Sequence, residues 1–409
     1  MPVLSNIRTL YQCRAEGGQA AVHPIEDAAL AWEGGRIRWV GPRRELPAEL
    51  AAAPRWDAAG GIVVPGLVDC HTHLAFGGWR YDEFERRILG VSYLEIARAG
   101  GGIRSTVART RDAATPWLVE RCLGHLNEMG KLGVTTVEAK SGYGLSLDQE
   151  LRLLEVYRSV ARRAPQRLVA TLLGAHVVPP EYQGRRGDYV RLVAEAMIPA
   201  AADRGLASFC DVFVEDSAFS IQEARLILEA GQRHGLGAKL HADQLSWGGG
   251  AELAGALGAV SADHLERISD AGIEAMAEAG VVAVSLPLAS LYLQQPPLPA
   301  RRLLEAGVAV AVATDFNPGS APSYHLPLAM TLAATLQRMT PAEVLKGATL
   351  VAAGALGLEV EVGSLEAGKR ADFALLDAES VEHWLYHFTA SACRLTVCDG
   401  NELARRSVS

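Results

Sequence analysis

The chain has 409 residues, of which 49% are hydrophobic and 21% charged, a composition that is ordinary for a soluble globular protein. Its formal net charge of −8 leaves no basic surface for phosphates, so nucleic acid is excluded as an expected partner. The length exceeds one usual compact core and fits a barrel of about 250 residues with a smaller second domain.

The sequence carries no sign of membrane insertion or secretion. No apolar stretch reaches about 18 residues, and the N-terminus lacks the regions of a signal peptide. The cysteines are scattered without a CxxC pair, which favours reduced, mostly buried thiols over a disulfide framework. We therefore expect a cytoplasmic protein with no membrane partner.

The two ends of the chain share a pattern of short apolar alternations broken by turn residues. Residues 1 to about 60 predict a small antiparallel β-unit, and the C-terminal stretch repeats the style. We predict that both termini build one small β-domain, from residues 1–64 and 358–409. A barrel domain of residues 65–357 lies between them.

Short β-branched or apolar runs alternate with helical segments through the middle of the chain, which is typical of βα units and a parallel sheet. Eight such runs favour an α/β fold with a (β/α)8 TIM barrel, although eight strands also allow a doubly wound sheet. All but the seventh run end in a titratable or metal-competent residue. Because the C-terminal strand ends of a barrel open on one face, we expect the functional site there. The runs are Ile62–His73, Val134–Lys140, Leu168–His176, Cys210–Glu215, Ala238–Asp243, Val260–Glu266, Val281–Leu286 and Val308–Asp315.

The stretch between the first two runs, from His73 to Val134, is longer than one crossover needs. It contains a Gly-rich segment at residues 99–103. We interpret the stretch as an excursion over the barrel mouth and a candidate lid.

The first run ends in two histidines separated by one residue. On a strand, residues i and i+2 point to the same side, so His71 and His73 can reach one ion. A histidine pair alone is weak evidence for a metal site, because such pairs also occur by chance or pack in protein cores. The fifth run, however, has His241 near its end and the eighth ends with Asp315, and three imidazoles with a carboxylate suit zinc or iron. We predict one zinc or iron ion per chain on these four residues.

A bound ion would give the site hydrolytic chemistry, because a divalent ion lowers the pKa of a bound water toward about 7. Asp315 can hold the ion and also carry the water's proton to a leaving nitrogen. His264, in the sixth run, can orient the water or polarise a carbonyl, unless it merely packs. The sequence leaves open which of these two catalytic candidates is the principal proton carrier.

Several motifs together resemble a known family. PGLVDCHTH, KLHADQ, ATDFNPG and GSLEAGKRADF are similar to the amidohydrolase superfamily over nearly the whole chain. With GGWR, EAKSGYGL and GAH, the combination more narrowly resembles the imidazolonepropionase family, which hydrolyses 4-imidazolone-5-propanoate to N-formimidoyl-L-glutamate in histidine degradation. The resemblance implies a metal-activated water on the four ligands named above. It also implies substrate contacts from Arg80, Tyr143, His176, Gln244, Asn317, Gly319 and Ser320.

The chemistry of that substrate agrees with several of these contacts. The planar guanidinium of Arg80 can form a bidentate ion pair with the propanoate carboxylate. Tyr143, His176 and Gln244 suit the N–H and C=O groups of the ring. Taken singly, Arg80 could be a surface arginine, Tyr143 a core aromatic and Asn317 a turn former.

Two departures from related enzymes narrow the interpretation. Relatives that deaminate purines or pyrimidines commonly carry a proton-shuttling glutamate where this chain has Gln244, which cannot transfer a proton. Dinuclear relatives often carry a lysine carbamate at the fourth strand, which here ends in Glu215. One ion is the simpler prediction, with Glu215 or Lys140 as alternatives for a second site, and Lys140 otherwise as an ion-pair or substrate-side residue.

Two other functions stay open at this point. Another cyclic amidohydrolase or a deaminase would share the metal but not the role of Arg80, and a deaminase would release ammonia. The alternative that is not an enzyme is a metal-binding protein with the same barrel fold and no catalytic activity. Exposed barrel helices often form symmetric dimers, so we also expect a homodimer.

Overall fold

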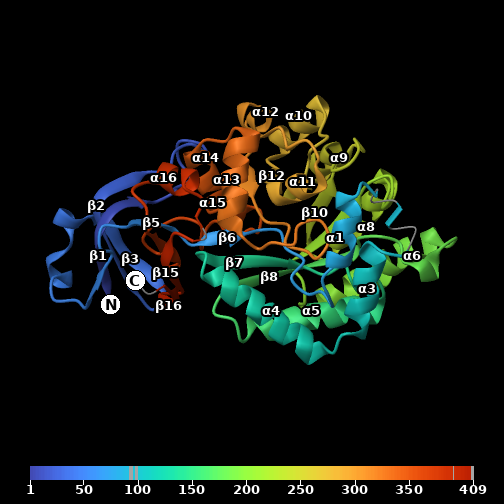
Figure 1. The fold of residues 1–409 in the computed structure, drawn as a ribbon, viewed down its shortest axis with the longest axis horizontal. Coiled ribbons are helices and arrows are strands. Elements are labelled where there is room, and N and C mark those ends of the chain that lie inside the picture. Colours follow the sequence, from blue (N-terminus) through green and yellow to red (C-terminus); the bar gives the residue numbers. More distant parts are fainter. Residues whose placement is uncertain (92–94, 97–99, 390, 407–409) are drawn as a thin grey trace.

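The computed structural model describes residues 1–91, 95–96, 100–389 and 391–406. Two eight-stranded sheets organise these residues, a barrel sheet inside the helical body and a terminal sheet beside it (Figure 1). The blue N-terminal strands and the red C-terminal strands share the terminal sheet, and both chain ends lie at that end of the molecule (Figure 1).

The barrel sheet is parallel, and each strand pairs with its sequence neighbour in the order β13-β12-β11-β10-β9-β8-β7-β6. The two edges meet through a parallel bridge between Thr72 and Phe316, next to which the His73 N–H donates to the Phe316 carbonyl at 2.8 Å. This nearly closed ring confirms the predicted (β/α)8 barrel. Its strands are β6 (Leu67–Asp69), β7 (Val134–Lys140), β8 (Arg167–Ala175), β9 (Phe209–Val214), β10 (Gly237–Ala242), β11 (Ser261–His264), β12 (Val282–Ser285) and β13 (Val310–Val312).

Helices connect the barrel strands and cover the outside of the sheet (Figure 1). Local sequence specifies where some of them begin: Ser220 and Glu223 form a reciprocal capping box at α8, and Thr340 and Glu343 form another at α14. The α-helices are α1 (Tyr81–Ile88), α3 (Ile103–Asp112), α4 (Thr115–Gly130), α5 (Leu147–Ala161), α6 (Arg186–Leu192), α7 (Ile198–Asp203), α8 (Ile221–Arg233), α9 (Gly250–Leu257), α10 (Asp270–Ala279), α11 (Pro287–Leu293), α12 (Ala300–Glu305), α13 (Leu326–Gln337), α14 (Pro341–Gly347), α15 (Leu350–Gly354) and α16 (Val381–Tyr386). Shorter turns are η1 (Arg43–Glu45), η2 (Ala48–Leu50), η3 (Pro180–Tyr182) and the π-helical η4 (Val193–Met197).

The predicted first run, Ile62–His73, is not one strand. β5 (Ile62–Pro65) belongs to the terminal sheet, and only β6 belongs to the barrel. The break falls at Gly66, where a Cβ would overlap with the side chain of Thr135. The prediction was wrong because a continuous apolar run is compatible with a buried strand of either sheet.

The terminal sheet joins the two chain ends, as predicted, in the order β16-β15-β14-β5-β1-β2-β3. It is not purely antiparallel as expected, because β1 pairs in parallel with β4 and β5. We keep residues 1–64, 65–357 and 358–409 as proposed domain limits. The remaining strands are β1 (Val3–Tyr11), β2 (Pro24–Glu33), β3 (Arg36–Pro42), β4 (Arg55–Asp57), β14 (Phe373–Leu376), β15 (Cys393–Cys398) and β16 (Asn401–Arg405).

The long connection between β6 and β7 contains α1, α3 and α4. Of the Gly-rich segment at 99–103, residue 99 lies outside the described residues, and the rest leads into α3. The carboxylate of Glu83 on α1 accepts a hydrogen bond from the Gly102 N–H at 2.7 Å, which ties α1 to the start of α3. A lid function of this segment stays a prediction.

The cysteines are all buried and free, as the scattered pattern predicted. Within the parts of the chain that the structure describes, no helix has both the length and the apolar character needed to cross a membrane.

Candidate metal centre

The ends of three barrel strands bring the four predicted metal ligands together. Oδ1 of Asp315 lies 3.5 Å from Nε2 of His71 and 3.5 Å from Nε2 of His73. Nε2 of His73 in turn lies 3.5 Å from Nε2 of His241. All four side chains are buried. We refer to His71, His73, His241 and Asp315 as the four-ligand set.

Two carboxylates orient two of these histidines. Nδ1 of His71 lies 2.6 Å from Oδ2 of Asp263, and Nδ1 of His241 lies 3.1 Å from Oδ1 of Asp211. Because a carboxylate can only accept a hydrogen bond, each Nδ1 carries a hydrogen. In the neutral ring, each Nε2 then carries a lone pair. Carboxylates commonly hold metal-binding histidines in this tautomer.

The four-ligand set fits a metal ion. Three pairs of its ligand atoms lie 3.5 Å apart (Asp315 with His71, Asp315 with His73, and His73 with His241), and Nε2 of His71 has no hydrogen-bond partner among the described residues. Buried acceptors that face each other are unfavourable unless a cation lies between them. A tetrahedral ion with bonds of about 2.1 Å separates its ligand atoms by about 3.4 Å, close to the spacing seen here.

A buried ion-pair network joins four strands of the barrel. Nζ of Lys140 lies 2.7 Å from Asp211, 3.1 Å from Glu138 and 3.2 Å from Asp263. Nζ of Lys239 lies 3.1 Å from Glu138, and none of these five side chains is exposed. Burial opposes the charge of Lys140, but the three carboxylates outweigh it and hold its pKa well above the usual value. Lys140 is thus an ion-pair residue, and it links the two carboxylates that orient the metal-site histidines.

Glu215, the other alternative for a second ion, points to the loop after β10. Its carboxylate accepts hydrogen bonds from the Leu245 N–H, at 2.9 Å, and from the Ser246 hydroxyl. Among the residues that the structure describes, Glu215 belongs to none of the buried groups that could share an ion. One ion per chain stays our prediction.

Three residues at the strand ends around the site have a strained backbone. Asp243, His264 and Asp315 have φ angles of 49°, 79° and 54°, a region that residues other than glycine rarely adopt. Such conformations cost of order 1–3 kcal/mol each and cluster at functional sites. The ring of His264 lies 5.4 Å from that of His241 and 5.8 Å from that of His71, so this catalytic candidate borders the metal site.

Tyr143 and His176 form one wall of the site. The His176 ring stacks on His73 with centroids 5.3 Å apart, and the Tyr143 ring lies 5.5 Å from His176. Nδ1 of His176 lies 3.1 Å from the Gly142 carbonyl oxygen, so it donates there and Nε2 is left as an acceptor. Burial, followed by the charge of His241, lowers the pKa of His176 to about 3. His176 is therefore neutral at pH 7 and suited to accept a hydrogen bond from a ring N–H.

Arg80 is buried and forms an ion pair. Its Nε and Nη2 donate to Oε2 of Glu83 at 3.0 and 2.6 Å, which uses one edge of the guanidinium. Nη1 lies so close to Gly319 that a Cβ on this glycine would overlap with it. Glu83 therefore fixes the guanidinium of Arg80 beside Gly319.

Asn317 organises the loop that follows Asp315. Its Nδ2 donates to the Asp315 carbonyl at 2.7 Å, and its Oδ1 accepts from the N–H groups of Gly319, at 2.7 Å, and Ser320, at 2.8 Å. The Ser320 hydroxyl lies 3.4 Å from Oδ2 of Asp315. Asn317 therefore has the turn-forming role, and its contact with substrate stays a prediction. Gln244 is buried just after β10.

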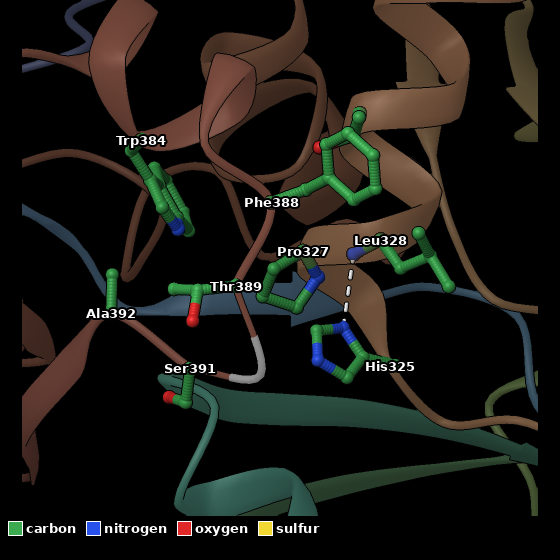
Figure 2. Close-up of a pocket in the computed structure, with 9 residues that line it drawn as sticks. His325, Pro327, Leu328, Trp384, Phe388, Thr389, Ser391 and Ala392 are labelled. Atoms are coloured by element: carbon green, nitrogen blue, oxygen red, sulfur yellow. Dashed lines mark hydrogen bonds between the residues drawn. The ribbon is translucent and has the colours of Figure 1, made fainter.

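A separate pocket of about 310 Å³ lies between α13 and α16 and includes none of the four-ligand set (Figure 2). Trp384, Phe388 and Ala392 form apolar parts of its wall (Figure 2). The His325 ring accepts a hydrogen bond from the Leu328 N–H at 3.0 Å and so caps α13. The described residues that line this pocket include no cluster of acid-base groups for hydrolysis.

The fold and the four-ligand set define a class of protein, the metal-dependent amidohydrolases. The profile of the amidohydrolase family matches residues 215–403. Two solved structures share the fold: E. coli guanine deaminase, with a TM-score of 0.75 at 16% identity and full coverage of both chains, and a triazine hydrolase from Arthrobacter aurescens, with a TM-score of 0.76 at 17% identity, covering 99% of this chain and 94% of the hydrolase.

Two curated relatives identify the particular family. The imidazolonepropionase of Paraburkholderia phymatum is 52% identical over 334 residues, which cover 81% of this chain and 82% of that protein. The imidazolonepropionase of Myxococcus xanthus is 46% identical over 408 residues, which cover 99% of this chain and 96% of that protein. The chain belongs to the imidazolonepropionase family, whose members are hydrolases that act on carbon–nitrogen bonds.

Sequence reasoning assigned no role to several carboxylates that support the site. Asp211 and Asp263 hold the histidines, Glu83 holds Arg80, and Glu266 lies beside His264. The first two had a usable signal, because each interrupts a barrel strand and a buried carboxylate requires a partner.

Proposed function

We propose that this chain hydrolyses 4-imidazolone-5-propanoate to N-formimidoyl-L-glutamate, a step of histidine degradation. The observation that carries the proposal is the 46% identity with an imidazolonepropionase over 99% of the chain. The burial and spacing of the four-ligand set support it, because opening a ring amide requires an activated water. We further propose that the protein works in the cytoplasm as a homodimer.

The four-ligand set would hold one zinc or iron ion, since imidazole nitrogens and a carboxylate oxygen suit both. When bound, the ion supplies a Lewis acid and lowers the pKa of a neighbouring water. The protein's part is to fix the ligands in the right tautomers, which Asp263 and Asp211 do at His71 and His241.

Asp315 would carry the proton. Burial favours its neutral form, but the neighbouring imidazoles, that of His71 most of all, outweigh this and lower the pKa of Asp315 below its usual value. Asp315 is therefore ionised at neutral pH. Its carboxylate can take a proton from the attacking water and return it to the departing ring nitrogen.

The remaining side chains would orient the substrate. The propanoate carboxylate would pair with Arg80, and the neutral Nε2 of His176 would accept a hydrogen bond from the ring N–H. Tyr143, which lies against His176, and Gln244 would complete the contacts with the ring. The Asn317 loop would bring Gly319 and Ser320 to the substrate.

A turnover assay tests the proposed function. Purified, metal-loaded protein should consume 4-imidazolone-5-propanoate and form N-formimidoyl-L-glutamate without releasing ammonia. The rival function, deamination, predicts one ammonia for each turnover of its own substrate. Absence of turnover on the imidazolone by protein that holds its metal would contradict the proposal.

A further inference from the structure

The carboxylate of Glu266 faces the imidazole of His264 in a buried position. Glu266 follows β11 by two residues, and its side chain is 1% exposed. Oε1 of Glu266 accepts a hydrogen bond from the Ser290 hydroxyl on α11 at 2.7 Å. Oε2 points to Nδ1 of His264 at 3.9 Å, and among the described residues neither of these two atoms has a hydrogen-bond partner.

The backbone holds the two side chains against each other. His264 and Leu265 both have positive φ angles, 79° and 68°, so the chain turns sharply where β11 ends. The Leu265 N–H donates to the Ala242 carbonyl at 3.0 Å, and the Arg267 N–H donates to the Asp243 carbonyl at 2.8 Å, which fixes this turn to the end of β10. Strain of this kind persists only where the surrounding structure imposes it.

The two unpartnered atoms complement each other chemically. A distance of 3.9 Å is too long for a hydrogen bond, but a buried acceptor or donor left unpaired costs about 1–3 kcal/mol. A shift of about 1 Å, or one shared water, would satisfy both atoms. Because a carboxylate oxygen can only accept, the pairing requires a hydrogen on Nδ1 of His264.

We propose that Glu266 is a positioning residue that accepts the Nδ1–H of His264 and so leaves Nε2 of His264 as a lone pair toward the metal site. A ring nitrogen of His264 lies within 4.8 Å of ring nitrogens of His71 and His241, so the His264 ring borders the metal site. With this tautomer, His264 orients the attacking water as an acceptor and does not polarise the carbonyl as a donor. The inference rests on the proposed function, because it selects between two roles of His264 in that reaction.

A double-mutant cycle tests the coupling in zinc-loaded protein. Glu266→Gln should lower kcat roughly tenfold or more, with metal content and KM unchanged, because the tautomer of His264 is no longer fixed. His264→Gln should lower kcat further, and the double variant should be no slower than His264→Gln alone. Independent, multiplying effects of the two substitutions would overturn the proposal.

Glu252 offers a matched control. Its Oε1 also accepts from a serine hydroxyl, that of Ser269 at 2.6 Å, and its Oε2 is also buried and unpartnered among the described residues. Its other donor is the Trp247 indole, not an imidazole. Glu252→Gln removes the same charge and should leave kcat within about twofold of the wild type. An equal loss in both variants would show a general effect of deleting a buried carboxylate and would overturn the coupling.

The tautomer of His264 can be determined without an activity assay. Nitrogen-15 NMR of histidine-labelled, zinc-loaded wild type should show the Nδ1–H form for the His264 signals, assigned by their loss in His264→Gln. Glu266→Gln should populate the Nε2–H form. An Nε2–H form in the wild type would overturn the inference even if the enzyme opens the imidazolone ring. An Nδ1–H form without any turnover would instead contradict the proposed function alone.

Discussion

At the scale of single residues, Asp315 combines two roles that a substitution can separate. Asp315→Asn keeps the side chain's size and an oxygen for the ion but cannot take a proton. We expect kcat to fall about 10² or more, the scale of general acid-base catalysis, with the metal retained. Steady-state kinetics and metal analysis of the same preparation measure both effects. Unchanged turnover in the metal-loaded variant would remove Asp315 from the proton transfer.

Substitutions of Arg80 test whether the site binds the carboxylate of the substrate. Arg80→Lys should weaken kcat/KM, and Arg80→Met should weaken it more, by roughly ten- to a hundredfold, because a charged hydrogen-bond partner is worth about 1.5–3 kcal/mol. The Arg80→Met variant also removes an ion-pair partner from the buried carboxylate of Glu83. The double variant Arg80→Met/Glu83→Gln therefore serves as its control.

An imidazolone without the propanoate tail completes the Arg80 experiment. The wild type should process this compound poorly, and Arg80→Met should process it no worse than the wild type does. If Arg80→Met lowers activity equally on both compounds, Arg80 is structural and does not recognise the carboxylate.

The metal-free site should release a proton when it binds an ion. Burial and Lys140 oppose a charge on His71, but Asp263 and Asp315 outweigh them and raise its pKa to about 9. His71 is then protonated at pH 7 in the metal-free protein, and the ion needs its lone pair. Metal affinity should therefore rise as pH rises toward 9, by about tenfold per unit.

Calorimetry in buffers of different ionisation enthalpy measures this proton release. The wild type should release about one proton at pH 7 and almost none well above pH 9. Asp263→Asn removes a charge that raises the pKa of His71, so it should release less at pH 7. Metal binding without proton release at pH 7 in the wild type would contradict a raised pKa at His71.

At the scale of strands, the buried network holds β7, β9, β10 and β11 together. Lys140→Met would leave three buried carboxylates with one lysine, and breaking a buried ion pair typically costs about 3–5 kcal/mol. The free energy of unfolding in urea, measured on metal-free protein, should fall by this amount. Lys131→Met is the matched control, because Lys131 pairs with Glu128 on the exposed surface, where a pair is worth about 1 kcal/mol or less. Equal losses in both variants would contradict a stabilising network.

The elements also show where sequence reasoning works and where it stops. The barrel strands from β7 onward follow from short apolar runs that end in polar residues, and the convergence of His71, His241 and Asp315 follows from barrel geometry. The division of Ile62–His73 between two sheets does not follow, because burial makes both halves apolar. Contacts across the barrel, such as Asp263 with His71, depend on strand register, which a single sequence does not specify.

At the scale of the whole molecule, the terminal sheet is tied to the barrel by specific pairs. Arg167 on β8 contacts Asp372, just before β14, at 2.9 Å and Asp399, in the turn between β15 and β16, at 3.1 Å. The sequence predicted that the termini would meet, because both ends show the same alternating pattern. It did not predict these pairs, since long-range ion pairs carry no local signal.

The central claim is that one ion on the four-ligand set drives hydrolysis of the imidazolone ring. A metal titration tests it most directly: the protein is stripped with a chelator, and turnover of 4-imidazolone-5-propanoate is followed as zinc or iron is returned. We predict no turnover in the stripped protein, a linear rise to one equivalent per chain, and a plateau beyond it. Turnover that survives complete removal of the metal, or that appears only after a second equivalent binds, would contradict the claim.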